Sequence, residues 1–297
     1  MKRTTTVVLF LVQVLSCSCS SGDRSPEFRL CVDQCTLSKC SSCEEDCGYY
    51  CMHQVTREDV HHNRPVRQFH GKWPFVRLLG VQEPASVLFS LLNGAAVVVG
   101  YHRFSTSSPS DYHLHSVLHV ELLVSVNTWL WSAVFHTRDV GWTEKMDYFS
   151  AALLIVCGLI VQFIRLSGRG ALLWQCLYGA VWMGLFLLHV AYLSMSERFN
   201  YGYNMAVCVI AGTVYAVVWT AWSIKEWRRR HYVWKCVVAV LWGSCTVLLE
   251  LLDFPPLLWA VDAHALWHLS TAPIPLLWYS FLTDDAKYEM TRHKKQV

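Results

Sequence analysis

Two histidines in an apolar stretch near the C-terminus have the spacing of a metal-binding pair. His264 and His268 are four positions apart, so a helix would place both imidazoles on one face, about one turn apart. Pairs with this spacing bind zinc, and a catalytic zinc site usually has three protein ligands and a fourth position for water. The pair therefore predicts a zinc site that needs a third ligand from elsewhere in the chain.

A second group of polar residues supplies that ligand. Ser132 and His136 are also four positions apart, and Asp147 stands at the start of the next apolar run. We predict that His136 completes the zinc site with His264 and His268. Zinc would lower the pKa of a bound water towards ~7 and so make a hydroxide nucleophile. Asp147 would accept or orient the proton of that water, and the Ser132 hydroxyl would hydrogen-bond the developing oxyanion.

Other roles stay open for the same residues. An intramembrane histidine can form a hydrogen bond between helices, and serine helps helices to pack closely. Asp147 could cap the N-terminus of a helix, a role compatible with catalysis. Ser132 could also be the nucleophile, although zinc-bound hydroxide needs fewer assumptions. A single site is favoured only if the fold places the separate pieces at one depth in the membrane.

The composition predicts an all-α membrane protein with seven transmembrane helices. Of the 297 residues, 54% are hydrophobic and 16% are charged, against about 25% charged in soluble domains. A helix needs about 20 apolar residues to cross a hydrocarbon core of about 30 Å. The formal charge of +3 is too small and too scattered to suggest nucleic acid as a partner. The predicted spans are Pro84–Tyr101, His113–Phe135, Asp147–Leu166, Ala171–Leu193, Tyr203–Ile224, Tyr232–Leu252 and Leu257–Leu282.

The basic residues predict the orientation of these spans. Arg228 to Arg230 follow the fifth span, and Lys294 and Lys295 lie in the tail, so the positive-inside rule favours a luminal N-terminus and a cytosolic C-terminus. The second span then ends, and the seventh begins, on the luminal side, where all five candidate residues can converge. The two tail lysines also resemble a dilysine retrieval signal to the endoplasmic reticulum, with an ordinary solvated tail as the alternative.

The N-terminal part of the chain predicts export. Lys2 and Arg3 precede a short apolar run and small residues, as in a signal peptide over residues 1–20, and the alternative is an uncleaved anchor. We expect a cysteine-rich luminal domain over 21–82, the membrane domain over 83–283 and a cytosolic tail over 284–297. Three disulfides of open connectivity are predicted in the luminal domain, and a zinc knot on Cys40 and Cys43 is the alternative. The six cysteines concerned are Cys31, Cys35, Cys40, Cys43, Cys47 and Cys51.

The five candidate residues together resemble the CREST superfamily of membrane hydrolases, which includes alkaline ceramidases and the progestin/adipoQ receptors. The shared elements of that superfamily are a serine and a histidine four apart, an aspartate shortly after them, and a His-x-x-x-His pair in the last helix. Ser132, His136, Asp147, His264 and His268 stand at these positions.

Further stretches are similar to the Per-like branch of that superfamily, the post-GPI-attachment factors. They are Cys31–Cys35, Phe135–Asp139 and Thr143–Ser150, together with the six-cysteine segment. This resemblance implies a Golgi enzyme that remodels the lipid of GPI-anchored proteins by a phospholipase A2 type of hydrolysis at the unsaturated sn-2 acyl ester. The alternatives are a receptor or chaperone for GPI-anchored proteins with a structural zinc, and a ceramidase-like amide hydrolase, against which the cysteine-rich domain argues.

Overall fold

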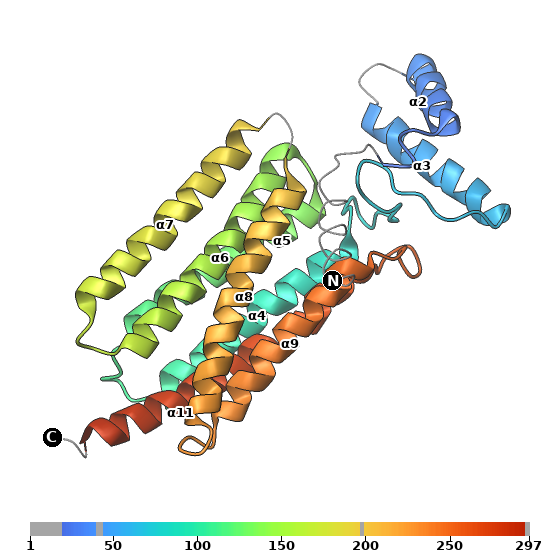
Figure 1. Cartoon of the computed structure of the whole chain (residues 1–297). Coiled ribbons are helices and arrows are strands. Elements are labelled where there is room, and N and C mark those ends of the chain that lie inside the picture. The colour runs from blue at the N-terminus through green and yellow to red at the C-terminus, as the bar shows by residue number, and fades with distance from the viewer. Residues whose placement is uncertain (1–19, 40–43, 197–198, 295–297) are drawn as a thin grey trace, which may run out of the picture. The chain divides into compact units, whose positions relative to one another are not determined.

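The chain is nearly all helical, as the composition predicts. A computed structural model describes residues 20–39, 44–196 and 199–294 (Figure 1). Residues 1–19 of the predicted signal peptide lie outside these ranges, and so do Cys40, Cys43 and Lys295. The described chain divides into two compact units, one made of residues up to 77 together with 253–263, the other of residues 78–252 and 264 onward.

The first unit is built on two helices that disulfides hold together. Helix α2 spans Pro26–Lys39 and helix α3 spans Glu44–His61. Cys31 pairs with Cys51 and Cys35 with Cys47, so cysteines four apart on each helix form a nested pair of bridges. Two disulfide bonds of the predicted cysteine framework are thereby confirmed, and their connectivity, which the sequence left open, is defined.

The second unit contains the membrane helices. Among the described residues, six helices are long and apolar enough to cross a bilayer. They are α4 (Pro84–Ser107), α5 (His115–Thr137), α6 (Gly141–Ser167), α7 (Leu172–Met195), α8 (Tyr201–Glu226) and α9 (Val233–Leu252). Helix α5 packs between α4 and α6, and the contacts of these three helices are the most extensive in the bundle (Figure 1).

The segment predicted as a seventh span, Leu257–Leu282, is divided in the structure. Helix α10 begins only at Ala263 and ends at Thr271, and helix α11 runs from Ile274 to Lys294, well into the predicted tail. Pro273 explains the break, because proline has no backbone N–H to donate and disfavours a helical conformation in the residue before it. The two histidines of the C-terminal pair therefore lie in a short helix of nine residues rather than in a long span.

A buried cluster of charges joins three segments at the end of the bundle where α6 ends. Asp285 of α11 is fully buried and accepts hydrogen bonds from Arg165 of α6 and from the Tyr232 hydroxyl, the latter at 2.7 Å. Arg230, which precedes α9, lies 2.5 Å from Glu289 and 3.4 Å from Asp285. Because a buried charge is costly unless it is paired, this cluster fixes how α6, α9 and α11 meet.

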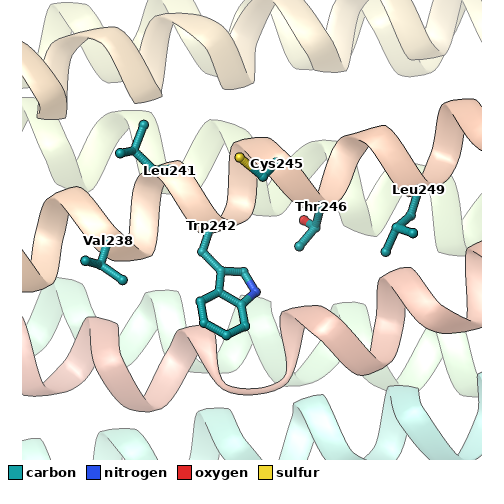
Figure 2. Close-up of a pocket in the computed structure, with 6 residues that line it drawn as sticks. All are labelled: Val238, Leu241, Trp242, Cys245, Thr246 and Leu249. Carbon is teal, nitrogen blue, oxygen red and sulfur yellow. The ribbon is translucent and has the colours of Figure 1, made fainter.

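Helix α9 presents an apolar surface of the kind that faces lipid. A shallow, open groove of about 480 Å³ runs along it, and the side chains that line the groove all come from this one helix (Figure 2). They are Val238, Leu241, Trp242, Cys245, Thr246 and Leu249. Leu241 is 52% exposed, which suits a bilayer and not water. The groove carries no acidic, basic or histidine side chain, and the candidate site residues lie elsewhere.

The first prediction concerns the charge cluster. Asp285→Asn keeps the side-chain shape but removes the fully buried one of the two carboxylates that Arg165 and Arg230 share, and leaves only Glu289. We expect it to lower the free energy of unfolding by about 3–5 kcal/mol, as measured by thermal unfolding of the purified chain in detergent. The control is Asp284→Asn, which removes the partner of Lys235 in a more exposed pair and should cost no more than about 1 kcal/mol. Equal losses in the two variants would contradict a structural role specific to Asp285.

Candidate metal centre

The structure brings the three predicted histidines together. His136 lies in the last turn of α5, and His264 and His268 lie one turn apart in α10. The three Nε2 atoms are 3.3 Å (His136 to His264), 3.2 Å (His136 to His268) and 3.0 Å (His264 to His268) apart. His136 and His268 are each only 2% exposed. The group is therefore compact and mostly shielded from solvent.

These distances fit three ligands of one metal ion. Zinc–nitrogen bonds of about 2.0–2.1 Å in a tetrahedral site place the nitrogens about 3.3–3.4 Å apart. The observed separations of 3.0–3.3 Å are close to that value, and three nitrogens would leave the fourth tetrahedral position open. The three histidines could hold a metal ion, and imidazole suits zinc, copper, iron and nickel alike.

Helix α4 holds α10 in position. The side-chain amide of Asn93, which is completely buried, donates a 2.6 Å hydrogen bond to the main-chain carbonyl of His268. The Thr271 hydroxyl lies 3.2 Å from the Asn93 side-chain oxygen and 2.9 Å from the same His268 carbonyl. These bonds use the last turn of α10, whose carbonyls have no backbone partner within the helix because α10 stops before Pro273. The break in the predicted span thus leaves the His268 carbonyl without an α-helical backbone partner, and Asn93 binds it.

Two carboxylates bind the outer nitrogens of the histidines. The Nδ1 atom of His136 lies 2.7 Å from Glu83, and Nδ1 of His264 lies 2.7 Å from Glu250. Glu83 is 4% exposed. The sequence motifs do not include Glu83, whereas Glu250, near the luminal end of the sixth predicted span, could be expected to line the site. Glu250 carried a signal, because an acid near the end of a predicted span is expensive without a partner.

Glu83 belongs to a polar stripe that could have been detected. Glu83, Ser86, Ser90 and Asn93 recur at steps of three, four and three, the spacing of one helix face, in an otherwise apolar segment. All four are buried, at 4% exposure or less. Through this stripe α4 touches His136, Ser132 and the backbone of His268. A polar stripe on a membrane helix indicates a site inside the bundle, even without a recognisable motif.

Ser132 is buried one turn before His136 on α5, and its hydroxyl lies 3.0 Å from that of Ser90. Ser90 donates its single proton to the Ser86 carbonyl at 2.7 Å. A serine hydroxyl has only one proton to donate, so Ser132 is the donor in the bond between the two serines. The hydroxyl of Ser132 is therefore oriented, with its lone pairs directed away from Ser90.

Asp147 lies in the second turn of α6 and is half-buried. Its predicted place as the first residue of a helix is wrong, because α6 begins at Gly141. Thr143 helps to explain the earlier start, since this third helical residue accepts the N–H of the cap residue Val140 at 3.0 Å, as in one half of a capping box. Only the short connection between α5 and α6 separates this turn from His136, so Asp147 lies at the same end of the bundle.

The other intramembrane histidines lie apart from this group. His115 and His119 are at the opposite end of α5, where His119 binds the Tyr101 hydroxyl at 3.1 Å. His189 in α7 is buried and stacks on Tyr203, with ring centroids 5.4 Å apart. Within the described residues, His136, His264 and His268 form the group with metal-ligand geometry.

Fold and site together define a multi-pass helical membrane protein with a largely buried group of three histidines. The model of the Per1-like family matches residues 35–286, and the chain belongs to that family. The similarity to the Per-like branch that the motifs indicated is thereby confirmed.

Similar proteins cover almost the whole chain. A GPI-specific phospholipase A2-like PGAP3 of Xenopus laevis is 42% identical over 95% of this chain and 94% of its own length. The human protein of that name is 42% identical over 91% and 90% of the two chains. The post-GPI attachment to proteins factor 3 of Drosophila melanogaster is 37% identical over 92% and 91%. No solved structure matches the chain.

The second prediction concerns metal content. We expect a transition metal to co-purify with the wild-type chain and to be lost in His268→Ala, because this variant lacks one buried ligand and two histidines alone hold a metal weakly. The measurement is elemental analysis of purified protein by mass spectrometry. His189→Ala is the matched control, since it truncates a buried intramembrane histidine outside the group and should keep its metal. An unchanged metal content in His268→Ala would argue against the site.

Proposed function

We propose that this chain is a zinc-dependent hydrolase that removes the unsaturated sn-2 fatty acyl chain of GPI-anchored proteins, a phospholipase A2 type of reaction. The observation that carries the proposal is the group of three histidines, whose Nε2 atoms lie 3.0–3.3 Å apart within a bundle of apolar helices. The names of the relatives, GPI-specific phospholipase A2-like PGAP3 and post-GPI attachment to proteins factor 3, support the choice of substrate.

The chemistry of ester hydrolysis gives each proposed residue a task. A zinc ion held by His136, His264 and His268 would polarise the ester carbonyl and lower the pKa of a bound water towards ~7. Asp147 would orient that water and accept its proton. Ser132 would turn its hydroxyl from Ser90 to the developing oxyanion and stabilise the negative charge there. Ser132 as the nucleophile is the alternative.

The proposed setting is the Golgi membrane, with a luminal N-terminus, a cytosolic C-terminus and retrieval to the endoplasmic reticulum. The resemblance to the Per-like branch implies the compartment, and the basic loop at Arg228–Arg230 supports the orientation. The lipid of a GPI anchor lies in the luminal leaflet, so in this orientation the histidine group and the acyl ester would lie on the same side of the membrane. An acyl chain could then approach the bundle sideways from the bilayer.

The third prediction tests the activity itself. In cells that lack the endogenous enzyme, His264→Ala should leave the unsaturated sn-2 chain on GPI-anchored proteins, because the zinc site would lose a ligand. Mass spectrometry of the released anchors gives the measurement, and His189→Ala should restore remodelling as the wild type does. Normal loss of the sn-2 chain in cells with His264→Ala would contradict the proposal.

The fourth prediction separates an enzyme from a receptor or chaperone that uses zinc only for structure. Ser132→Ala and Asp147→Asn should each lower turnover about 10²-fold or more while zinc stays bound, because each acts on the reacting groups and not on the metal. Turnover of anchor lipid and zinc content are measured on the same preparations. Full remodelling by both variants would favour the non-enzymatic role or a different catalytic pair.

A further inference from the structure

We propose that Glu83 and Glu250 are positioning residues that fix the ring tautomers of His136 and His264 and thereby set the affinity of the site for its metal. The inference rests on the proposed zinc site and extends it to two carboxylates outside the Ser–His–Asp–His–His pattern. Its basis is two carboxylate–imidazole contacts of 2.7 Å, each on the Nδ1 atom of a histidine whose Nε2 points to the common centre.

The hydrogen bonds decide which nitrogen carries the proton. An ionised carboxylate can only accept a hydrogen bond, and a neutral imidazole has one N–H and one lone pair. With Glu83 at Nδ1, the proton of His136 must lie on Nδ1 and the lone pair on Nε2. Glu250 imposes the same tautomer on His264. Both rings therefore present the lone pairs that a metal requires, in the arrangement by which carboxylates commonly support metal-binding histidines.

With these tautomers, the distance between the two rings points to a cation at the common centre. The Nε2 atoms of His136 and His264 are 3.3 Å apart, although in these tautomers neither can donate a hydrogen bond to the other. Two lone pairs at that distance repel each other unless a cation lies between them. The carboxylates bring two further negative charges close to the rings, which favours a divalent cation at the centre. Tautomer, distance and charge thus agree on a cation-binding role.

His268 differs from the other two ligands. Its Nδ1 atom is buried and has no hydrogen-bond partner among the described residues. Its position comes from the backbone, through the Asn93 bond to its carbonyl and the helix it shares with His264. The site therefore has two ligands oriented by carboxylates and one oriented by its helix. This difference predicts that the two glutamates, and not a third acid, control metal retention.

Glu83 is held more rigidly than Glu250. It is the residue directly before α4, its own N–H donates to the His136 carbonyl at 3.0 Å, and the neighbouring Gln82 N–H donates to the Thr137 carbonyl at 3.2 Å. The side chain of Gln82 also accepts the Asp139 N–H at 2.7 Å. The Glu83 side chain is 5% exposed against 21% for Glu250, and a hydrogen bond is stronger where water is excluded. Glu83 should therefore have the larger effect.

The fifth prediction is a graded loss of zinc affinity. Glu83→Ala removes both charge and acceptor and should weaken zinc binding about 10–100-fold, as loss of such supporting carboxylates does elsewhere. Glu83→Gln keeps a carbonyl oxygen that can accept the Nδ1–H, so its loss should be smaller. Glu250→Ala and Glu250→Gln should follow the same order with smaller effects. Zinc affinity of the purified full chain in detergent is measured by competition with a chelator of known strength.

A control variant and a second measurement distinguish a loss of zinc affinity from a loss of folding. Glu121 is a buried acid of α5 that lies roughly 22 Å along the helix from His136, and Glu121→Gln should bind zinc as the wild type does. Thermal unfolding of the zinc-free chains shows whether a variant folds. A glutamate that served only to join helices would lower this stability and leave zinc affinity within about threefold of wild type, and that result in both alanine variants would overturn the inference.

The outcomes also separate this inference from the proposed function. If zinc affinity falls in the graded order but no variant, including the wild type, cleaves anchor lipid, the positioning role stands and the hydrolase proposal fails. If the wild type binds zinc and cleaves lipid while both alanine variants keep full zinc affinity, the hydrolase proposal stands and the positioning role fails. A wild-type chain that binds no zinc would overturn both.

Discussion

The contact between Glu83 and His136 is the interaction on which the candidate site depends. It joins the residue before α4 to the last turn of α5, two segments 53 positions apart in the chain. The backbone bonds of Gln82 and Glu83 to the end of α5 act in the same place, so the ring of His136 is fixed from both its side chain and its main chain. The remaining contacts of α4, to Ser132 and to α10, follow from the register that this contact sets.

A bilayer explains why polar contacts are concentrated in this way. Hydrocarbon offers no hydrogen bonds, so each polar group within a span must find a partner in the protein. Many of the buried polar groups of the described chain gather in two clusters at opposite ends of the bundle, the histidine group and the charges around Asp285. The first has convergent nitrogen lone pairs that match a metal, whereas in the second the arginines and carboxylates satisfy one another. Of these two clusters, only the histidine group therefore has the geometry to bind a ligand from outside the chain, such as a metal ion.

Much of the fold and part of the site could be predicted from the sequence. Hydropathy predicts the long helices. The four-residue spacing places His264 and His268 on one helix face, and the predicted topology places His136 on the same side of the membrane. Local chemistry changed the details: Pro273 divides the last predicted span, and the Thr143 cap starts α6 before Asp147. The polar stripe on α4 marks Glu83 and the cost of an intramembrane acid marks Glu250, but their pairing with His136 and His264 is a tertiary contact that no local period encodes. Zinc, the substrate and the catalytic residues remain proposals.

The hydrogen bonds of Ser132 bear on the choice between its two proposed roles. A serine nucleophile needs a base that takes its proton. In the structure the proton of Ser132 points to Ser90, a neutral hydroxyl whose own proton is given to the Ser86 carbonyl, and a neutral hydroxyl is a very poor base. A hydrogen bond between two neutral hydroxyls contributes only about 1 kcal/mol, so turning the Ser132 hydroxyl towards an oxyanion would cost little. The bond to a charged oxygen would be about twice as strong as the one it replaces. The local geometry therefore supports Ser132 as a hydrogen-bond donor to the oxyanion, and leaves activation of the nucleophile to the metal and Asp147.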